Sequence, residues 1–361
     1  MAARPETSNG KPAVLVTGST GLIGTRLVKR LAQRFRVVGC DVKPPDQEIG
    51  LDQHVDADLT DDADVRKSLE KIRGDYDGRL ASVVHLAAYY DFTGEPSPMY
   101  QKLTVEGTRR LLRELQKFSQ VGQFVFSSSL LVMQPVEPGE LMTEDSPTDA
   151  QWEYPQSKLD AEQVIREEHG TIPYVVLRIA GVYDAQCHSL PIAQQMSRIY
   201  EKSLESHVFP GDRDHGQALV HLDDLVDCFA RVVERRHQLR PEEMFLIAEP
   251  DVVSYGELQD RIGEVLHGEE WLTLRVPKAV ARAGAYVKNK LAPEGEEEFI
   301  KPWMIALADD HYAVDISSAR DKLGWKPQHR LRETVVEMAR LLKRDPQRWY
   351  KINKLTPPEG R

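Results

Sequence analysis

A glycine-rich turn near the start of the chain connects a short apolar run to a helical pattern. The run covers residues 13–16, the turn residues 17–24, and apolar residues then recur at helical spacing as far as Leu31. A short apolar run before such a turn indicates a buried strand, so the turn lies between a strand and a helix N-terminus. The chain is therefore expected to begin with a βα unit of an α/β fold.

The turn has the features of a pyrophosphate-binding loop. Gly18 permits a tight turn, Gly21 removes a side chain that would block phosphates, and Gly24 lets the helix pack closely on the strand. Free N–H groups at the helix N-terminus favour an anion. An ordinary tight βα connection is the alternative, although three glycines make it costly. The cofactor contacts predicted here are Gly18, Thr20, Gly21, Leu22, Ile23 and Gly24.

The second predicted strand, residues 36–40, ends at Asp41. An acidic residue about 20 positions beyond the glycine turn can hydrogen-bond the adenosine ribose and would repel a 2′-phosphate. The sequence therefore predicts NAD as the cofactor. NADP is a weaker alternative, because Lys43 lies close to Asp41 in the sequence.

Two further segments are placed to contact a dinucleotide. Asp58 and Leu59 follow the apolar Val55, where Asp58 could meet the adenine edge or cap a helix. Residues 81–88 read as a strand with small residues at its carboxyl end, the edge of an open α/β sheet where ligands bind. We expect Leu86, Ala87 and Ala88 to make room for the cofactor there.

Tyr154 and Lys158 are four residues apart in a predicted helix that has Pro155 in its first turn. The two side chains then share one helical face. An ammonium beside a phenol is expected to lower the phenol pKa, so that Tyr154 can exchange a proton with a substrate hydroxyl. An incidental amphipathic pair is the alternative.

These motifs, in this order, resemble the extended short-chain dehydrogenase/reductase family, also called the NAD-dependent epimerase/dehydratase family. The matching segments are 17–24, 58–59, 85–88, 127–129, Tyr154-x-x-x-Lys158, 175–183, 220–224 and 323–327.

The resemblance implies a Rossmann fold with a doubly wound parallel sheet and a Ser-Tyr-Lys active site. It implies that Ser129 polarises the substrate oxygen and that Lys158 also hydrogen-bonds the nicotinamide ribose. It further implies a homodimer formed through the helices around residues 99–118 and 155–169.

The chain is expected to divide into a cofactor domain and a smaller, discontinuous substrate domain. The predicted ranges are 1–12 for a disordered leader, 13–183 and 217–248 for the NAD-binding domain, and 184–216 and 249–361 for the substrate domain. The active cleft is expected between the two domains, at the carboxyl edge of the sheet.

Composition excludes several other classes. The net charge of −10 argues against a nucleic-acid surface, and no segment is apolar over the length of a membrane span. The three cysteines, Cys40, Cys187 and Cys228, are few and widely spaced, which favours a reducing compartment and predicts a cytoplasmic protein. His85, His188 and His221 lack ligand spacing, so no metal site is predicted.

Departures from the family pattern bear on the substrate. Leu130 and Leu131 follow the serines where 4,6-dehydratases of the family carry Thr-Asp-Glu. Gly181 stands where sugar-nucleotide epimerases place a diphosphate-binding Asn, and residues 217–219 and 306–310 lack the Arg usual there. Arg suits bidentate phosphate recognition, so these departures weaken a nucleotide-sugar reading. Arg213 or Arg275 could replace the missing Arg.

The remaining pocket signals are apolar, although they could equally belong to the core. The predicted substrate contacts are Tyr90, Phe92, Leu130, Gly181 and Tyr183. The leading hypothesis is an NAD-dependent oxidoreductase acting on a secondary alcohol or ketone of a small or apolar substrate, similar to the 3β-hydroxysteroid and dihydroflavonol branches of the family. The alternatives are an NDP-sugar 4-epimerase that retains NAD and a nonenzymatic NAD-sensing protein.

A predicted amphipathic helix at residues 276–291 places Val276, Val280, Ala283, Val287 and Leu291 on one face. Such a face usually packs on its own domain. Peripheral contact with a membrane, or a lid over the substrate, is the alternative.

Overall fold

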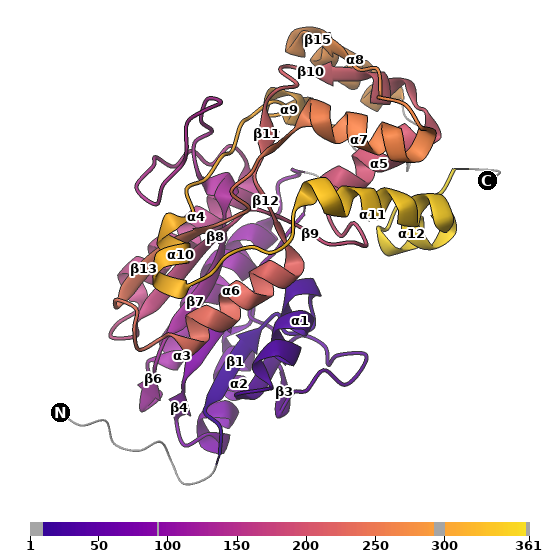
Figure 1. Cartoon of the computed structure of the whole chain (residues 1–361). Coiled ribbons are helices and arrows are strands. Elements are labelled where there is room, and N and C mark those ends of the chain that lie inside the picture. Colours follow the sequence, from indigo (N-terminus) through magenta and orange to yellow (C-terminus); the bar gives the residue numbers. More distant parts are fainter. Residues whose placement is uncertain (1–9, 92–93, 292–299, 359–361) are drawn as a thin grey trace.

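The computed structural model describes residues 10–91, 94–291 and 300–358. Its centre is a seven-stranded sheet with the order β13-β8-β7-β5-β1-β2-β3, in which every neighbouring pair is parallel (Figure 1). The strands are β1 (Ala13–Thr17), β2 (Arg36–Asp41), β3 (Gln53–Asp56), β5 (Ser82–His85), β7 (Phe124–Ser129), β8 (Tyr174–Ile179) and β13 (Glu242–Ile247). Most of their apolar residues are fully buried, as expected for a sheet covered on both faces.

Helices cover both faces of the sheet. One face packs against α2 (Asp62–Asp75), α3 (Glu106–Leu115) and α4 (Glu153–Glu168), with the π-helical turn η1 (Tyr100–Val105) before α3. The other packs against α1 (Leu22–Leu31), α6 (Leu222–Glu234) and α10 (Ser317–Leu323). The predicted α/β Rossmann fold with a doubly wound parallel sheet is confirmed.

A second group of helices lies beyond the carboxyl edge of the sheet (Figure 1). A separate apolar cluster joins α5 (Leu190–Glu201), α7 (Tyr255–His267), α11 (Leu331–Arg344) and α12 (Pro346–Ile352). The helices α8 (Lys278–Leu291) and α9 (Pro302–Ala306) follow α7 along the chain. The predicted division into two domains agrees with this arrangement but stays a prediction. The structure adds that α10, from the predicted substrate domain, packs on the sheet core.

Four pairs of short strands and two 3₁₀ turns complete the fold of the described residues. The paired strands are β4 (Arg79–Leu80) with β6 (Gln120–Val121), β9 (Gly181–Tyr183) with β12 (Leu219–His221), β10 (Val208–Pro210) with β15 (Leu274–Val276), and β11 (Gly216–Gln217) with β14 (Val253–Ser254). Two 3₁₀ turns are η2 (Leu130–Val132) and η3 (Leu204–His207). Within the described ranges, no helix combines the length and apolar character that crossing a membrane requires.

The predicted amphipathic helix exists as α8, but its packing face is not the predicted one. Val280 and Ala283 are exposed, whereas the partly buried side carries Lys278, Ala281 and Ala285. The expectation that the valine face packs on the substrate domain is wrong at these positions, because the protein covers another side of the helix. The side chains of Val287 and Leu291 lie outside the described residues, as do most of the predicted leader and Phe92.

Candidate active site

The glycine turn has the backbone geometry that the sequence predicts. Gly18 has φ +68°, and a Cβ there would lie 2.9 Å from the backbone nitrogen of Ala87. A Cβ on Gly24 would lie 2.1 Å from the carbonyl oxygen of Gly18. Any side chain at either position would push the loop away from its neighbours. Gly21 precedes α1 as its N-cap without a side-chain cap bond, and the first turn of α1 contains no acidic residue.

These features fit the pyrophosphate of NAD. Uncapped N–H groups at the N-terminus of α1 can donate to an anion. Leu22 and Ile23 open that helix, and Leu22 is exposed.

Asp41 ends β2 and contacts the glycine turn directly. Its Oδ2 accepts hydrogen bonds from the backbone N–H and hydroxyl of Thr20, at 3.0 and 2.9 Å. Its Oδ1 accepts from the backbone N–H of Val42 at 2.8 Å. Each carboxylate oxygen has more than one acceptor position, so Asp41 can hold the loop and still accept from a ribose hydroxyl. The sequence did not predict the Thr20 contact.

A hydrogen-bonded chain connects the turn to β5 and α3 through His85. The Thr108 hydroxyl donates to the carbonyl of Thr104 at 2.6 Å, so it accepts from His85 Nε2 at 3.0 Å. His85 Nδ1 then accepts from the Thr17 hydroxyl at 2.6 Å, and Thr17 accepts from the backbone N–H of Ala87. Burial lowers the pKa of His85 to about 3, so the ring is neutral. His85 is a structural residue here, as expected.

The remaining predicted cofactor residues lie in two segments, one directly after β5 and one between β3 and α2. Leu86, Ala87 and Ala88 follow β5, and the first two lie against Gly18. Asp58 is exposed, and its Oδ1 accepts from the backbone N–H of Thr60 at 2.8 Å. It does not cap α2, because Asp61 does so. Leu59 is buried.

The three serines at the end of β7 have different partners. Ser127 donates to the carbonyl of His85 at 3.0 Å, and Ser128 donates to Glu162 at 2.5 Å. Ser129 hydrogen-bonds the phenol oxygen of Tyr154, while its Oγ accepts from the backbone N–H of Leu131 at 3.2 Å. The structure therefore brings Ser129, rather than its two neighbours, to the predicted acid/base.

Tyr154 and Lys158 lie in the first turns of α4, as predicted. Lys158 is buried, its Nζ donates to the carbonyl of Ser127 at 2.7 Å, and the same atom lies 5.9 Å from the centroid of the Tyr154 ring. Burial lowers the pKa of Lys158 to about 7, partly opposed by the negative charge of Glu162. The side chains of Ser129, Tyr154 and Lys158 thus meet at the carboxyl edge of β7.

The predicted lowering of the Tyr154 pKa is corrected by the structure. Burial raises the pKa of Tyr154, and the hydrogen bond from Ser129 offsets only part of that rise. Desolvation disfavours a phenolate more than the neighbouring groups stabilise it. Sequence spacing identifies the neighbour but not the degree of burial.

Aromatic rings surround Tyr154. The ring of Tyr90 meets it edge-on at 4.9 Å, and that of Trp152 lies at 5.5 Å. Trp303, in α9, lies 5.1 Å from Trp152. Of these, the sequence analysis identified only Tyr90. Trp152 could have been noticed from its position two residues before Tyr154, whereas nothing local marks Trp303.

Three other predicted substrate contacts are Leu130, Gly181 and Tyr183, and two of them are buried. Leu130 is buried in the sheet core. Tyr183 is fully buried and hydrogen-bonds Glu249. Gly181 is exposed and packs against Leu219, whose Cδ2 would lie 2.5 Å from a Cβ at this position. Substrate contact at these residues stays a prediction, and for Leu130 and Tyr183 the geometry favours the core alternative.

Two acidic residues, Asp309 and Asp310, follow Trp303 closely in the sequence. Asp309 pairs with Lys278 and accepts from the backbone N–H of Asp212 at 2.9 Å. Burial raises the pKa of Asp310 to about 6, with a further rise from the charge of Asp309. The segment where the family pattern would supply an Arg is acidic instead.

The two arginines proposed as substitutes are already paired. Arg213 pairs with Asp260 at 3.5 Å and donates to the carbonyl of Thr273 at 2.9 Å. Arg275 pairs with Asp212 at 3.3 Å. To bind a phosphate, either arginine would first have to leave its carboxylate partner.

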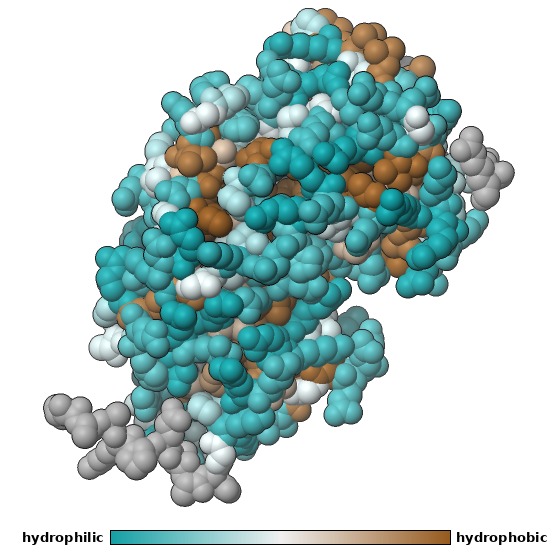
Figure 2. Space-filling model, in the orientation of Figure 1, coloured by the Kyte–Doolittle hydropathy of each residue, from teal (hydrophilic) through white to brown (hydrophobic). Residues whose placement is uncertain are grey.

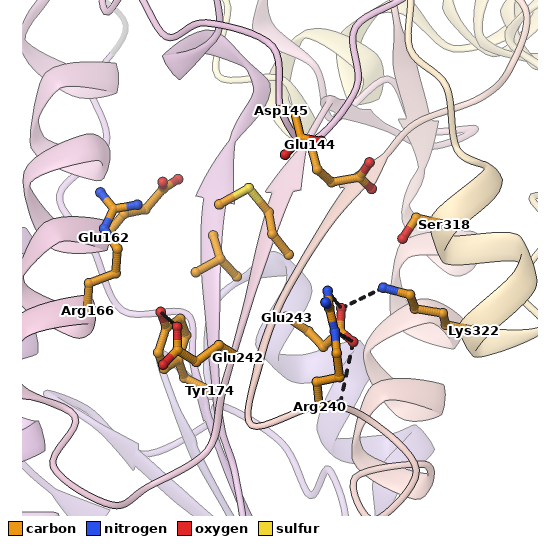
Figure 3. Close-up of a pocket in the computed structure, with 12 residues that line it drawn as sticks. Glu144, Asp145, Glu162, Arg166, Tyr174, Arg240, Glu242, Glu243, Ser318 and Lys322 are labelled. Atoms are coloured by element: carbon orange, nitrogen blue, oxygen red, sulfur yellow. Dashed lines mark hydrogen bonds and ion pairs between the residues drawn. The ribbon is translucent and has the colours of Figure 1, made fainter.

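A charged cavity of about 410 Å³ lies beside β8 and β13 (Figure 3). Figure 3 shows Glu162 and Arg166 facing Ser318 and Lys322 across it, with Glu243 bound to Arg240 and Lys322. Ser129, Tyr154 and Lys158 do not line it. It is therefore not the cleft predicted for the substrate.

A group of potential metal ligands forms at the start of α6. His221, Asp223 and His329 come close together, and the two imidazole rings stack with centroids 3.8 Å apart. The lone pairs of the ring nitrogens lie in the planes of the two rings. Because these planes are nearly parallel, the lone pairs of His221 and His329 do not converge on one ion. The sequence did not predict the contact with His329.

A Rossmann sheet with a glycine turn, and with Ser, Tyr and Lys side chains gathered at one edge, defines an NAD-dependent enzyme of the dehydrogenase/epimerase type. The model of the NAD dependent epimerase/dehydratase family matches residues 14–248. The chain belongs to that family.

Its relatives differ in their reactions. UDP-glucose 4-epimerase of Vibrio cholerae is 26% identical over 342 residues, which cover 91% of this chain and 94% of that protein. The decarboxylating sterol-4-alpha-carboxylate 3-dehydrogenase of Candida albicans is 26% identical over 49% of this chain and 52% of its own length. The crystal structure of UDP-glucuronic acid 4-epimerase from Bacillus cereus, in complex with UDP-glucuronic acid and NAD, has a TM-score of 0.67 at 18% identity. That match covers 92% of this chain and 99% of the epimerase chain, and it shows a shared fold.

Proposed function

We propose that this protein is an NAD-dependent oxidoreductase acting on a secondary alcohol or ketone of a small or apolar substrate. The observation that carries the proposal is a set of aromatic rings at Tyr154: the rings of Tyr90 and Trp152 lie beside it, and the ring of Trp303 lies against Trp152. Aromatic walls bind apolar rings and chains well and contribute little to binding a diphosphate. The carboxylate of Asp310, near Trp303 in sequence, points the same way, because its negative charge would repel a diphosphate.

In this proposal each residue of the triad has one task. Tyr154 holds its proton at neutral pH, because burial raises its pKa, and donates it to the carbonyl oxygen during reduction. Ser129 hydrogen-bonds the same substrate oxygen and fixes its position. Lys158 holds the end of β7 through the carbonyl of Ser127 and supplies positive charge when protonated. When bound at this site, NAD(H) would supply the hydride chemistry.

The cofactor residues divide by the part of NAD that they would contact. The turn from Gly18 to Gly24 would hold the pyrophosphate, and Asp41 the adenosine ribose. Asp58 and Leu59 would meet the adenine, and residues 86–88 would leave room for the dinucleotide. Lys158 would contact the nicotinamide ribose.

Tyr154→Phe tests the acid/base role. We expect it to reduce turnover of apolar ketones by at least about a hundredfold, since general acid catalysis typically contributes that much. NAD binding, measured by titration calorimetry, should stay unchanged. Tyr286→Phe, at an exposed tyrosine of α8, is the matched control. Full activity of Tyr154→Phe would contradict the proposal.

An NDP-sugar 4-epimerase is the second candidate, and the relative that spans 91% of the chain favours it. The two reactions differ in the fate of the cofactor. Denatured protein that releases near-stoichiometric NAD(H), together with interconversion of UDP-glucose and UDP-galactose, would support the epimerase. Protein that is purified empty and consumes NADH with apolar ketones would support the oxidoreductase. The third candidate, a nonenzymatic NAD sensor, is disfavoured by the family and by the complete Ser-Tyr-Lys set.

We also infer a cytoplasmic homodimer formed through the helices around residues 99–118 and 155–169. The three cysteines are buried and free, in keeping with a reducing compartment. On these helices Arg109 and Arg113 both pair with Glu168, so the outer surface is polar there. Light scattering tests the assembly, and a monomer at high concentration would refute it.

A further inference from the structure

Four polar side chains follow one another along one face of α4, from the candidate active site to the charged cavity. They are Tyr154, Lys158, Glu162 and Arg166, each four residues after the one before. Residues four apart are neighbours on a helix surface. Glu162 and Arg166 line the cavity of Figure 3, and Figure 2 shows mainly hydrophilic residues where Figure 1 places β13 and α10 beside it. Glu162 therefore lies between the catalytic pair and a polar surface.

The carboxylate of Glu162 is buried and held by two residues from the sheet. Its Oε1 accepts from the hydroxyl of Ser128 at 2.5 Å and from Nε of Arg178 at 3.1 Å. Its Oε2 accepts from a terminal nitrogen of Arg178 at 2.7 Å, and the two paired side chains are 1% and 5% exposed. A bidentate pair between a guanidinium and a carboxylate has a defined geometry. The negative charge of Glu162 is thus fixed at one place.

The same stretch of β7 holds Lys158. The Nζ of Lys158 donates to the carbonyl of Ser127 at 2.7 Å, and the next residue, Ser128, donates to Glu162. Because Lys158 and Glu162 are one helical turn apart, α4 and β7 close a ring of these four residues. Ser129, the serine of the proposed site, follows directly on β7. The ring therefore fixes the end of β7 from which that serine projects.

The charge of Glu162 acts on a lysine that burial tends to discharge. Burial lowers the pKa of Lys158 to about 7, and the negative charge of Glu162 opposes this change. The other titratable side chains beside Lys158 are His85, whose pKa burial lowers to about 3, and Tyr154, whose pKa burial raises. Both are neutral at neutral pH, so neither stabilises the ammonium as a carboxylate does.

Further charged groups lie on the far side of the pair between Glu162 and Arg178. Besides Arg166, those that line the cavity are Glu144, Asp145, Arg240, Glu242, Glu243 and Lys322. They have both signs, and Arg240 and Lys322 both bind Glu243. Lys158 does not line this cavity.

We propose that Glu162 is a positioning residue of the active site, which acts through Lys158. Its carboxylate, held by Ser128 and Arg178, keeps the Lys158 ammonium charged and in place beside Tyr154. The inference rests on the part that Lys158 has in the proposed function, and it holds for the reductase and the epimerase alike, because both would use that lysine. The alternative is a purely structural bond between α4 and β8.

Titration of the Lys158 side chain tests the inference without an activity assay. The ¹³Cε NMR signal of Lys158 in the cofactor-free protein is identified by its absence from Lys158→Met. We expect Glu162→Gln to move the midpoint of this titration to lower pH by about 1 pH unit, because the carboxylate that favours the ammonium is lost. Glu167→Gln, at an exposed glutamate of α4, is the matched control and should leave the midpoint unchanged.

Two further variants separate charge from folding. Glu162→Gln leaves the Arg178 guanidinium buried without its carboxylate, which is strongly destabilising. Glu162→Gln with Arg178→Met removes both charges, and the midpoint should again fall, because Glu162 is the charge that raises the pKa of Lys158. Ser128→Ala keeps both charges and should titrate like the wild type. Circular dichroism establishes that each variant is folded.

Turnover connects this titration to catalysis. With acetophenone and NADH, the loss of kcat at alkaline pH should follow the midpoint of Lys158, so Glu162→Gln should lose activity at lower pH than the wild type does. The KM for acetophenone should stay within about twofold, because Glu162 acts through Lys158 rather than on the substrate.

The titration and the turnover can fail separately. A lowered midpoint in a protein that turns over neither acetophenone nor UDP-glucose would support this inference and count against the proposed function. The inference is overturned if folded Glu162→Gln, or the folded double variant, titrates Lys158 at the wild-type midpoint. Lower stability with an unchanged midpoint would mean that Glu162 only fastens α4 to β8. A lowered midpoint with an unmoved kcat profile in an active enzyme would equally overturn it.

Discussion

Lys158 is the residue whose burial has the clearest consequence for stability. Its pKa in the folded protein is about 7, below the ordinary value of 10.5, because burial disfavours the ammonium. Between these two values the unfolded chain binds more protons at this residue than the folded chain does. The contribution of Lys158 to the free energy of unfolding therefore rises with pH from about 7 to about 10.

We predict that Lys158→Met removes this pH dependence. The difference in unfolding free energy between wild type and variant should move in favour of the wild type from pH 7 to pH 9, by at most about 1.4 kcal/mol per pH unit. Urea unfolding of the cofactor-free proteins at several pH values measures it. Lys29→Met, at an exposed lysine of α1, should show no such trend. Parallel pH profiles for wild type and Lys158→Met would contradict the prediction.

Single residues also show where sequence reasoning stops. The identity of Tyr154, Lys158 and Ser129 followed from motif order, and the structure brings all three together. The direction of the Tyr154 pKa did not follow, because it depends on how much water the surrounding fold removes. Trp303 was missed because its contact with Trp152 joins segments about 150 positions apart in the sequence.

At the scale of the element, the strands were the most predictable part of the fold. Each is a short apolar run bounded by turn residues, a pattern that a buried parallel strand requires. The face of α8 was not predictable in this way. Helical spacing identifies Val280 and Ala283 as one apolar surface, but it does not show whether another element covers that surface.

The glycine turn between β1 and α1 supports a prediction, because the backbone at Gly24 lies very close to that of Gly18 and Ser19. A Cβ at Gly24 would lie 2.1 Å from the Gly18 oxygen and 2.8 Å from the Ser19 Cα, and neither atom can rotate away. Gly24→Ala should therefore shift the turn, destabilise the protein by roughly 2–4 kcal/mol and weaken NAD binding at least about tenfold. Thermal unfolding and NAD titration measure the two effects.

Gly74→Ala is the matched control for Gly24→Ala. Gly74 lies in α2, and a Cβ there would meet nothing within 4 Å. Alanine is the better helix former, so this variant should gain up to about 1 kcal/mol and bind NAD normally. Wild-type NAD affinity in Gly24→Ala would show that the turn is not held by this contact.

At the scale of the whole molecule, two buried carboxylates connect the C-terminal helices to the sheet domain. Asp224, in α6, accepts from the backbone N–H groups of Gln328 and His329, both at 2.9 Å. Glu249 repeats the arrangement, since it binds Tyr183 and accepts from the backbone N–H of Leu331 at 3.0 Å. These bonds fix the start of α11, which belongs to the second apolar cluster.

Asp224→Ala should loosen this connection without disturbing the cofactor site. Two partly buried N–H groups would lose their charged acceptor, which costs roughly 2–4 kcal/mol together. Hydrogen exchange should accelerate at Gln328 and His329 and through α11, while the NAD dissociation constant stays within about twofold, because the lost bonds hold the start of α11, which belongs to the second apolar cluster. Asp223→Ala removes an adjacent carboxylate that is 52% exposed, and should change exchange little. Equal exchange in the two variants would mean that packing of the second cluster alone holds the C-terminal helices in place.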